Sequence, residues 1–358
     1  MMKSSKLLKT ETFLLKGIGI LLIVFHNFFH IIKPTCGENE FSFASNTFKN
    51  FINNITLHNS ISYFFTYFGH YGVQVFIFLS GYGLSVAYLN KNVTYSAFLK
   101  KRILKLYPTF TIVLVMILIY KYIILSGLWS MDSFMNLGLR YLLIANWVPG
   151  KIFVISGPFW FYSMIFQLYL LFPILLWVNK KNKYALFIIA IISFLFTIYY
   201  NSYFVSLKLS LYFNFAGNLP LFILGMLFAH KNEFKLKIVG WLLFIILFIA
   251  GQFFENLWYF SQISFIVILF PIILKLYNKY EHSYLSNFLI ITGKLSMYMF
   301  AVNGFMRGPW MYFLKHTNNE WSMYLFALFH IILVYLLALI VRKVEQQVLF
   351  IIEGSRGR

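Results

Sequence analysis

Two histidines and an asparagine lie inside a long apolar run near the start of the chain, KGIGILLIVFHNFFH (residues 16–30), which begins with a lysine. At about 100° per helical residue, Asn27 and His30 fall within about 40° of the direction of Lys16, with His26 on the flank of this stripe. Imidazole exchanges a proton near neutral pH. The pattern therefore predicts a proton-transfer site at His26, Asn27 and His30, with Lys16 about 15 Å along the axis from His26.

A structural role for these side chains is the alternative. Ionisable groups inside a membrane span usually face a bundle interior or a water-filled path, and His26 and His30 would also do so if they only linked neighbouring helices. Lys16 alone could extend its ammonium group to the membrane interface. Two histidines on one side of a helix, above a buried cation, favour the functional interpretation.

A second candidate site is the basic stretch FLKKRILKLYP (residues 98–108), which directly precedes another apolar run. Arg102 and Lys105 are three residues apart and share a helix face, with Lys101 beside them. Guanidinium and ammonium groups suit phosphate oxygens, which predicts a phosphate-binding site. The same residues also fit a positively charged anchor at the cytoplasmic end of a span, and both interpretations stay open.

Two further apolar stretches carry small or aromatic residues that have structural explanations. In GHYGVQVFIFLSGYGL, the small residues Ser80, Gly81 and Gly83 predict close helix packing. In GPFWFYSMIFQLYLLFP, Trp160 and Tyr162 suit the aromatic belt at the outer membrane interface.

The elements that hold these residues follow from composition. The 358-residue chain is 60% hydrophobic and only 11% charged, with a mean hydropathy of +0.75; a soluble domain carries about twice that share of charge. Apolar runs as long as a bilayer is thick recur without strand-like alternation. We therefore expect an all-α fold, a polytopic membrane helix bundle forming a single domain over residues 1–358. About ten spans are expected, near residues 13–33, 61–90, 106–126, 158–178, 184–201, 210–229, 238–254, 258–277, 288–308 and 322–341.

The first span has no small-residue cleavage site, so we expect a retained helix rather than a signal peptide. Cys36 is the single cysteine, which excludes an internal disulfide and a cysteine-based metal site. The segment 127–157 does not fit a crossing, because both of its flanks fall outside in this topology. We expect it to be interfacial or re-entrant and covered by protein.

The net charge of +20 does not indicate nucleic-acid binding, because the basic residues lie between spans rather than along one face. Most of the 30 Lys and Arg residues fall before the first span and in alternate connecting segments. By the positive-inside rule, both termini are expected to be cytoplasmic.

Taken in order, the motifs resemble those of acyltransferase family 3, bacterial membrane O-acyltransferases that act on sugars of polysaccharides, lipopolysaccharide, peptidoglycan and small glycosides. The resemblance covers nearly the whole chain. It rests on KGIGILLIVFH, GVQVFIFLSGYGL, FLKKRILKLYP, FWFYSMIFQLYLLFPIL, LPLFILGMLFA and GKLSMYMFAVNG.

The resemblance implies a mechanism in the bacterial cytoplasmic (inner) membrane. Acyl-CoA, with acetyl-CoA as the first expectation, binds on the cytoplasmic side without a metal, and its phosphates are held by basic residues. The acyl group passes through the bundle to a hydroxyl of an envelope polysaccharide or glycolipid, with a first-helix histidine as base. By position, Lys16 takes the family's first basic place, and Arg102 and Lys105, with Lys101 beside them, take its cytoplasmic basic motif.

Two departures from the family pattern concern histidines. The slot of the first-helix histidine holds Asn27, and the slot in the late signature holds Asn303. An amide cannot act as a general base near neutral pH, so a neighbouring histidine has taken the role or the chemistry has been lost. We favour His26, since a modest helix rotation aims it at the same cavity, while His30 lies nearer the expected acceptor.

Side chains expected on the outer side are candidates for acceptor binding. Glu38 and Glu40 follow in the outer loop and can orient a histidine or bind a sugar hydroxyl, although solvated loop carboxylates are the plainer interpretation. Trp160, Tyr162 and Asn303 are the other candidates on this side.

Two functions without acyl transfer remain as alternatives. The missing family histidines motivate a non-enzymatic polysaccharide exporter or assembly protein on the same scaffold. A small-molecule transporter is the third interpretation, although the broken mid-bilayer helices of transporters are not evident in the sequence.

Overall fold

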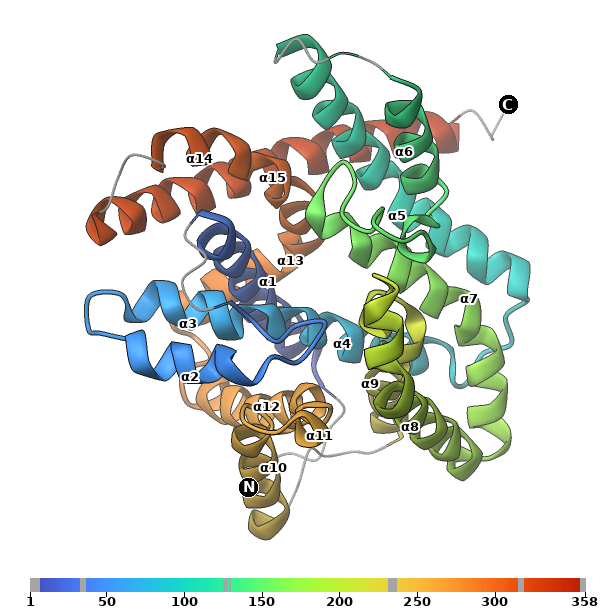
Figure 1. Cartoon of the computed structure of the whole chain (residues 1–358). Helices are drawn as coiled ribbons and strands as arrows, with labels where there is room; N and C mark the ends of the chain where they lie inside the picture. The colour runs from blue at the N-terminus through green and yellow to red at the C-terminus, as the bar shows by residue number, and fades with distance from the viewer. Residues whose placement is uncertain are drawn as a thin grey trace.

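The computed structural model describes residues 7–32, 37–124, 128, 130–230, 237–314 and 319–354. These residues form helices and connecting turns, with no β-strand among them (Figure 1). The α-helices are α1 (Lys9–Ile32), α2 (Ser45–Asn54), α3 (Ser60–Phe68), α4 (Gly72–Tyr88), α5 (Tyr95–Leu118), α6 (Met131–Tyr141), α7 (Trp160–Lys181), α8 (Lys183–Ser206), α9 (Phe215–Phe228), α10 (Ile238–Ala250), α11 (Glu255–Trp258), α12 (Ser261–Lys279), α13 (Tyr284–Asn303), α14 (Gly308–Leu314) and α15 (Glu320–Gly354). The shorter helical turns are η1 (Gly69–Tyr71), η2 (Ile119–Ile124), η3 (Ala145–Trp147), η4 (Gly157–Phe159), η5 (Leu211–Phe213) and η6 (Phe305–Arg307).

The expected polytopic all-α membrane bundle is confirmed. Within the described residues, eight helical segments are long and apolar enough to cross a membrane. The other two expected spans, near 210–229 and 238–254, correspond to the shorter apolar helices α9 and α10. At about 1.5 Å per residue, a helix of 13 residues is about 20 Å long, less than the roughly 30 Å of a bilayer core.

Helix α1 lies inside the bundle, against α13, α4, α3 and α15 (Figure 1). Its crossing with α13 depends on two glycines. A Cβ atom on Gly293 would lie 1.8 Å from the carbonyl oxygen of Phe13, and one on Gly17 would lie 2.0 Å from that of Leu289. No side chain fits at these distances, so α1 and α13 touch backbone to backbone.

The predicted role of small residues in α4 is correct for Gly81 and wrong for Gly83. A Cβ on Gly81 would lie 2.0 Å from the carbonyl oxygen of Phe222 in α9, whereas Gly83 has no neighbouring atom within 4 Å. Gly83 lies on the exposed side of α4, while Gly81 lies on the side that packs against α9.

The second span is interrupted between α3 and α4. Residues Gly69–Tyr71 form a single 3-10 turn, which places His70 where the two helices meet. Glycines allow this turn to approach α1 closely, since a Cβ on Gly69 would lie 2.5 Å from the Cβ of His26. The turn therefore brings His70 beside the histidines of α1.

The segment expected to be interfacial or re-entrant does not cross the bundle. It contains α6, whose 11 residues extend only about 16 Å. Arg140, fully buried, donates to the carbonyl oxygens of Lys151 and Ile152. Asn146 donates to the carbonyl oxygens of Trp160 (2.8 Å) and Phe213 (2.6 Å). These hydrogen bonds fix the segment to the start of α7 and to the turn η5 before α9. The helix α6 itself is largely exposed, with Met131 at 85% and Phe134 at 56%, so the expected cover by protein is not found among the described residues.

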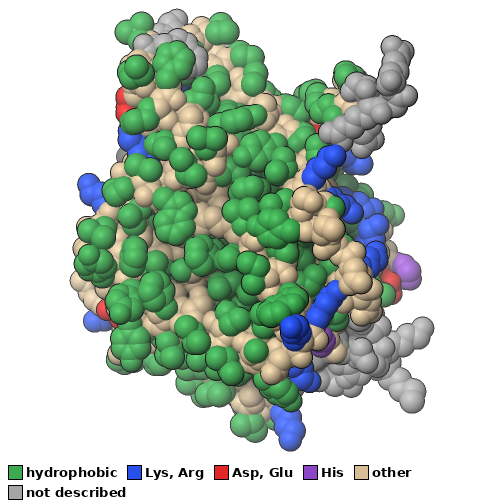
Figure 2. All heavy atoms as spheres, turned by 90° about the vertical axis from the view of Figure 1, so that its right-hand side faces the viewer, with side chains coloured by type: hydrophobic (Ala, Val, Ile, Leu, Met, Phe, Trp, Pro, Cys, Tyr) green, Lys and Arg blue, Asp and Glu red, His purple; other side chains and the backbone are tan. Residues whose placement is uncertain are grey.

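The surface of the bundle is apolar over most of the side that carries α5, α7 and α8. Figure 2 shows hydrophobic side chains covering this face, with Lys and Arg side chains gathered along one edge. Both the start of α1 and the later part of α15 lie toward the basic motif of α5, because Lys16 interacts electrostatically with Lys105 and Glu345 accepts a hydrogen bond from Thr109. Cys36 lies outside the described residues.

Candidate functional site

A cavity of about 340 Å³ lies among α1, α7, α13 and the segment that follows α1, at the end of the bundle away from Lys16. It brings together most of the residues predicted for the chemistry and the acceptor. These are His26, Asn27, His30, Glu38, Glu40 and Trp160. His70 and Arg307, which the sequence did not single out, complete the polar lining.

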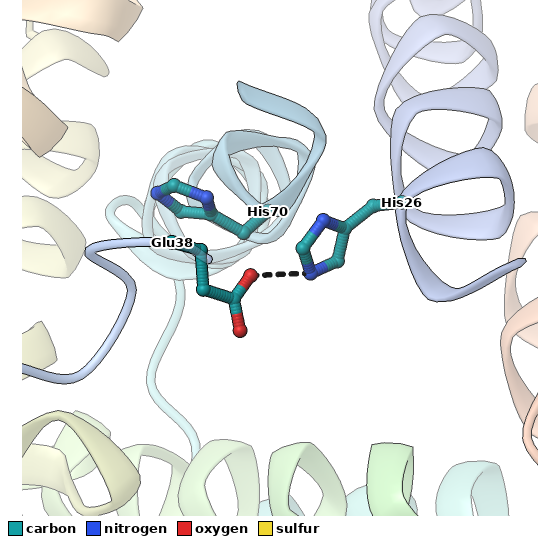
Figure 3. Close-up of side chains that lie close together, drawn as sticks. All are labelled: His26, Glu38 and His70. Carbon is teal, nitrogen blue, oxygen red and sulfur yellow. Dashed lines mark ion pairs between the residues drawn. The ribbon is translucent and has the colours of Figure 1, made fainter. Parts of the chain in front are cut away.

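His26 and Glu38 form the central contact of this cavity. The Nε2 atom of His26 lies 2.9 Å from Oε2 of Glu38, and its Nδ1 atom lies 3.0 Å from the carbonyl oxygen of Phe65 in α3. The side chains of His26 and Glu38 are 7% and 16% exposed, so water screens this contact little. Figure 3 shows Glu38 reaching from its loop toward the ring of His26, with His70 on the other side of the carboxylate.

The two nitrogens of His26 face different partners. The carbonyl of Phe65 can only accept, so Nδ1 of His26 carries a hydrogen in this contact. Nε2 faces the carboxyl group of Glu38 at 2.9 Å, a contact that becomes an ion pair when the imidazole is protonated. Both nitrogens of His26 are therefore engaged.

His30 is held more loosely than His26. Its Nε2 atom is 3.5 Å from Oε1 of Glu38, longer than a normal N–H···O bond, and its side chain is 33% exposed. Its Nδ1 atom has no hydrogen-bond partner among the described residues. The two rings stack with their centroids 5.3 Å apart. Glu38 thus bridges the two histidines, and His30 is the one with a nitrogen available for a further proton.

The two predicted loop carboxylates have opposite protonation tendencies. Burial acts to raise the pKa of Glu38, but the facing histidines outweigh it and lower that pKa to about 2. Burial, reinforced by the charge of Glu38, raises the pKa of Glu40 well above its ordinary value. Glu38 is therefore the charged group of the site, and Glu40 is the one that favours the neutral form.

His26, Glu38 and His70 also satisfy a simple criterion for metal binding. Each offers one ligand atom, and these atoms lie within 4.8 Å of one another. Of the three, His26 and Glu38 lie in direct contact, 2.9 Å apart.

Asn27, which stands in the family's histidine slot, is bound by an arginine. Nη1 of Arg307 donates to the backbone carbonyl oxygen of Asn27 at 3.2 Å and to its side-chain Oδ1 at 3.3 Å. An amide held in this way has no basic atom. Asn27 is therefore a structural contact of the cavity wall and not its base.

Asn303, in the other histidine slot, belongs to a separate series of buried hydrogen bonds. Trp310 donates its indole N–H to Nδ1 of His330 at 3.0 Å. Nε2 of His330 must then carry the hydrogen that reaches Oδ1 of Asn303, also at 3.0 Å. Asn303 and His330 are both fully buried and do not line the cavity. Asn303 ends α13 at the cavity end of the bundle, but the structure does not bring it into the cavity lining.

The two predicted aromatic residues lie at different depths. Trp160 lines the cavity and meets Phe41 edge to face, with centroids 5.1 Å apart. Tyr162 is 3% exposed, packs on Phe110 and lies outside the cavity lining, within electrostatic reach of Glu345. Trp160 therefore lies at the cavity, whereas Tyr162 packs in the core outside the cavity lining.

The basic residues form a second group near the other end of α1. Arg102 is 8% exposed, and its guanidinium lies 5.8 Å from the ring centroid of Tyr169 and 5.4 Å from that of Phe98. Lys105 interacts electrostatically with Lys16, Arg102 and Lys101. The predicted donor-side set is therefore brought together, with Lys101 and Lys105 exposed on the surface and Arg102 inside.

A buried acid near this basic group was missed by the sequence reasoning. Glu345 is 5% exposed and accepts hydrogen bonds from Thr109 at 2.5 Å and from Tyr298 at 2.6 Å. It also interacts electrostatically with Lys105. Glu345 follows Arg342 and Lys343 in the polar run RKVEQQ, beyond the predicted span 322–341, so no signal in the sequence indicated that it would be buried.

His70 and Arg307 could have been noticed. His70 is the second residue of the GHYGVQ motif, and Arg307 lies three residues after the end of the late signature at Gly304. Neither has a spacing that points to α1, because their contacts with His26 and Asn27 join residues far apart in the chain.

The family comparison agrees with this arrangement. The sequence model of a family described as an acyltransferase domain matches residues 14–342, which include both the cavity and the basic group. No curated protein and no solved structure is similar enough to the chain to give a match. With nearly its whole length matched, and with apolar helices that carry buried histidines and cations, the chain belongs to the acyltransferase 3 family of membrane acyltransferases.

Proposed function

We propose that the protein is an O-acyltransferase of the bacterial inner membrane. It moves an acyl group, with acetyl expected, from cytoplasmic acyl-CoA to a hydroxyl of an envelope polysaccharide or glycolipid. The observation that carries this proposal is the cavity in which Glu38 bridges His26 and His30, inside a chain of the acyltransferase 3 family.

The geometry supports His30 as the base. In acyl transfer, the acceptor oxygen attacks the acyl carbonyl carbon, and the hydroxyl proton must be removed as the new C–O bond forms. His30 has an unengaged nitrogen, while Glu38 faces its other nitrogen and can stabilise the imidazolium that results. His26, with both nitrogens engaged, anchors Glu38. The C–S bond then breaks, and the coenzyme A thiolate leaves and takes up a proton.

The basic group supports a donor site at the opposite end. Arg102, Lys105 and Lys16 present cations that suit the phosphates of coenzyme A. Lys16 and His26 are about 15 Å apart along α1. A donor held by its phosphates at one end would extend its acyl arm through the bundle toward the histidines.

Mass spectrometry of envelope glycans from wild-type and deletion strains tests the function. We expect the deletion strain to lose one acyl mass, and the size of that mass identifies the donor. In purified protein, acetyl-CoA should raise the melting temperature of the wild type, and Arg102→Ala should abolish that increase. Arg140→Gln, which removes a buried arginine of α6 that does not line the cavity, is the matched control.

The exporter alternative has a different outcome. The amides at Asn27 and Asn303 favour it, since neither can act as a base. It predicts unchanged glycan masses, glycan retained inside the deletion strain and no stabilisation by acetyl-CoA. That combination would refute the proposed enzyme.

A further inference from the structure

Arg307 is a buried cation without a buried anion beside it. It is 7% exposed, lies on the short turn η6 between α13 and α14, and lines the cavity. No carboxylate among the described residues pairs with it. Burial lowers its pKa to about 10, so the guanidinium remains charged at neutral pH. A desolvated charge is costly unless it is paired.

The hydrogen bonds of Arg307 leave one edge of its guanidinium free. Nε donates to the carbonyl oxygen of Gly304 at 3.0 Å, and Nη1 donates to both oxygens of Asn27. Nη2 has no hydrogen bond to any described residue. It lies beside Gly157, where a Cβ would be only 3.2 Å from it, and Gly157 also lines the cavity. Arg307 is thus fixed on one side and has two N–H groups left on the other.

This free edge lies close to the proposed base. The charge of Arg307 acts on His30, so the two side chains border the same space. The carboxylate of Glu38 already faces His26 at 2.9 Å. In the part of the chain that the structure describes, no carboxylate therefore pairs with the charge of Arg307.

Arg140 provides a contrast within the same structure. It is also buried and has no acidic partner among the described residues. Its two Nη atoms, however, are both directed at acceptors, the carbonyl oxygens of Lys151 and Ile152 and the side chain of Asn146. It does not line the cavity. Both Nη atoms of Arg140 thus have acceptors within the protein, whereas Nη2 of Arg307 has none among the described residues and faces the cavity.

We propose that the free edge of Arg307 is a binding site for an anionic oxygen of the acyl group under transfer. This inference rests on the proposed function and adds a residue to it. As the acceptor oxygen bonds to the carbonyl carbon and its proton moves to His30, the C=O electron pair moves to oxygen and creates an oxyanion. Arg307 would donate to this oxyanion until the thiolate leaves and the C=O bond forms again. A carboxylate carried at the end of a dicarboxylic acyl chain has the same chemistry and is the second source.

Kinetics of the purified full-length protein separate the two sources. Wild type, Arg307→Gln, Arg307→Lys and Arg140→Gln are compared with acetyl-CoA and with succinyl-CoA as donors. If the site binds the oxyanion, Arg307→Gln lowers kcat about 10²–10³-fold with both donors. If it binds a carboxylate, Arg307→Gln raises KM for succinyl-CoA and leaves acetyl-CoA unaffected. Arg307→Lys keeps the positive charge but replaces the planar guanidinium by a single ammonium group. It should therefore retain part of the wild-type activity.

A binding measurement keeps the proposal testable without turnover. Succinate should raise the melting temperature of wild type and of Arg140→Gln, but not that of Arg307→Gln. The neutral analogue succinamide should leave the melting temperature of all three unchanged. If no variant transfers acyl groups but succinate binding still depends on Arg307, the proposed function fails and the anion site stands. If Arg307→Gln and Arg307→Lys match wild type within about threefold in kcat, KM and succinate binding, the inference is overturned. An equal loss in Arg140→Gln also overturns it.

Discussion

The two histidines of α1 differ in what their nitrogens are free to do. His26 uses both nitrogens, for Phe65 and for Glu38, whereas His30 has one nitrogen without a partner and one long contact to Glu38. A base needs an unengaged nitrogen before it can take a proton. The sequence-based preference for His26 stays a prediction, and the geometry shifts our expectation to His30.

Replacing each histidine separately tests this distinction. We expect His30→Ala to lower kcat about 10²–10⁴-fold with little change in melting temperature, because it removes the base and no strong contact. His26→Ala should lower both kcat and melting temperature, because it leaves Glu38 without its ion pair. Activity assays and thermal denaturation measure the two effects, with exposed His58→Ala as control. Full activity in His30→Ala combined with inactivity in His26→Ala would assign the base to His26.

Glu38 should give the protein an acid-sensitive contact. Its pKa in the folded protein is about 2, below the ordinary 4.5, because the effect of the facing histidines exceeds that of burial. A lowered carboxyl pKa contributes stability that is present above 4.5 and is lost as the pH falls toward 2. The wild type should therefore have a higher melting temperature than Glu38→Gln at neutral pH, and the difference should shrink between about pH 5 and about pH 3. A difference that is constant with pH would contradict this origin.

At the scale of elements, close helix contacts set the positions of the side chains in the cavity. Gly17 and Gly293 allow α1 to lie directly on α13, and Gly81 and Gly225 do the same for α4 and α9. The 3-10 turn η1 then places His70 beside His26. Without these contacts, the histidines of α1 would not face the loop that carries Glu38.

A glycine substitution at the crossing of α4 and α9 should be destabilising. A Cβ on Gly225 would lie 2.1 Å from the carbonyl oxygen of Phe78, and backbone atoms cannot move aside as a flexible side chain can. Gly225→Ala should therefore cost about 1–3 kcal/mol and lower the melting temperature. Gly83→Ala, with no atom within 4 Å, is the matched control and should be neutral. Equal melting temperatures for the two variants would show that the helices are less closely packed.

At the scale of the whole molecule, the two ends of the bundle differ in chemistry. One end has exposed lysines around a buried arginine, and the other has the cavity with its histidines and carboxylates. The edge of Lys and Arg side chains beside the apolar face in Figure 2 has the pattern expected for a cytoplasmic membrane interface. We therefore expect the basic end to be cytoplasmic and the cavity to face outward.

Cysteine labelling in intact cells tests this orientation. Cys36→Ser removes the single cysteine. In that background, Leu57→Cys and Tyr284→Cys lie in predicted outer and inner segments, at positions that are 91% and 96% exposed. A membrane-impermeant maleimide should label Leu57→Cys in intact cells and Tyr284→Cys only after permeabilisation. The reverse pattern would invert the topology.

The class of the protein, most of its helices and its family could be predicted from the amino-acid sequence. A low share of charge and long apolar runs leave few folds besides a helical membrane bundle, because lipid offers no hydrogen bonds to the backbone. The sequence also predicted full spans near 210–229 and 238–254. The helices there, α9 and α10, are shorter, and hydropathy does not show where a helix ends. Lys16, Arg102, His26 and His30 were found from helical periodicity within single segments.

The contacts of each polar side chain, in contrast, depend on how the helices pack against one another. Which nitrogen of which histidine is free depends on Phe65 and Glu38, which come from other segments. Asn27 and Asn303 both stand where the family has a histidine, so the sequence treats them alike. The structure distinguishes them, because Arg307 binds Asn27 at the cavity and His330 binds Asn303 in the core. Hydrogen bonds and burial between residues distant in the chain are set by how the helices pack, and no periodicity within one helix encodes them.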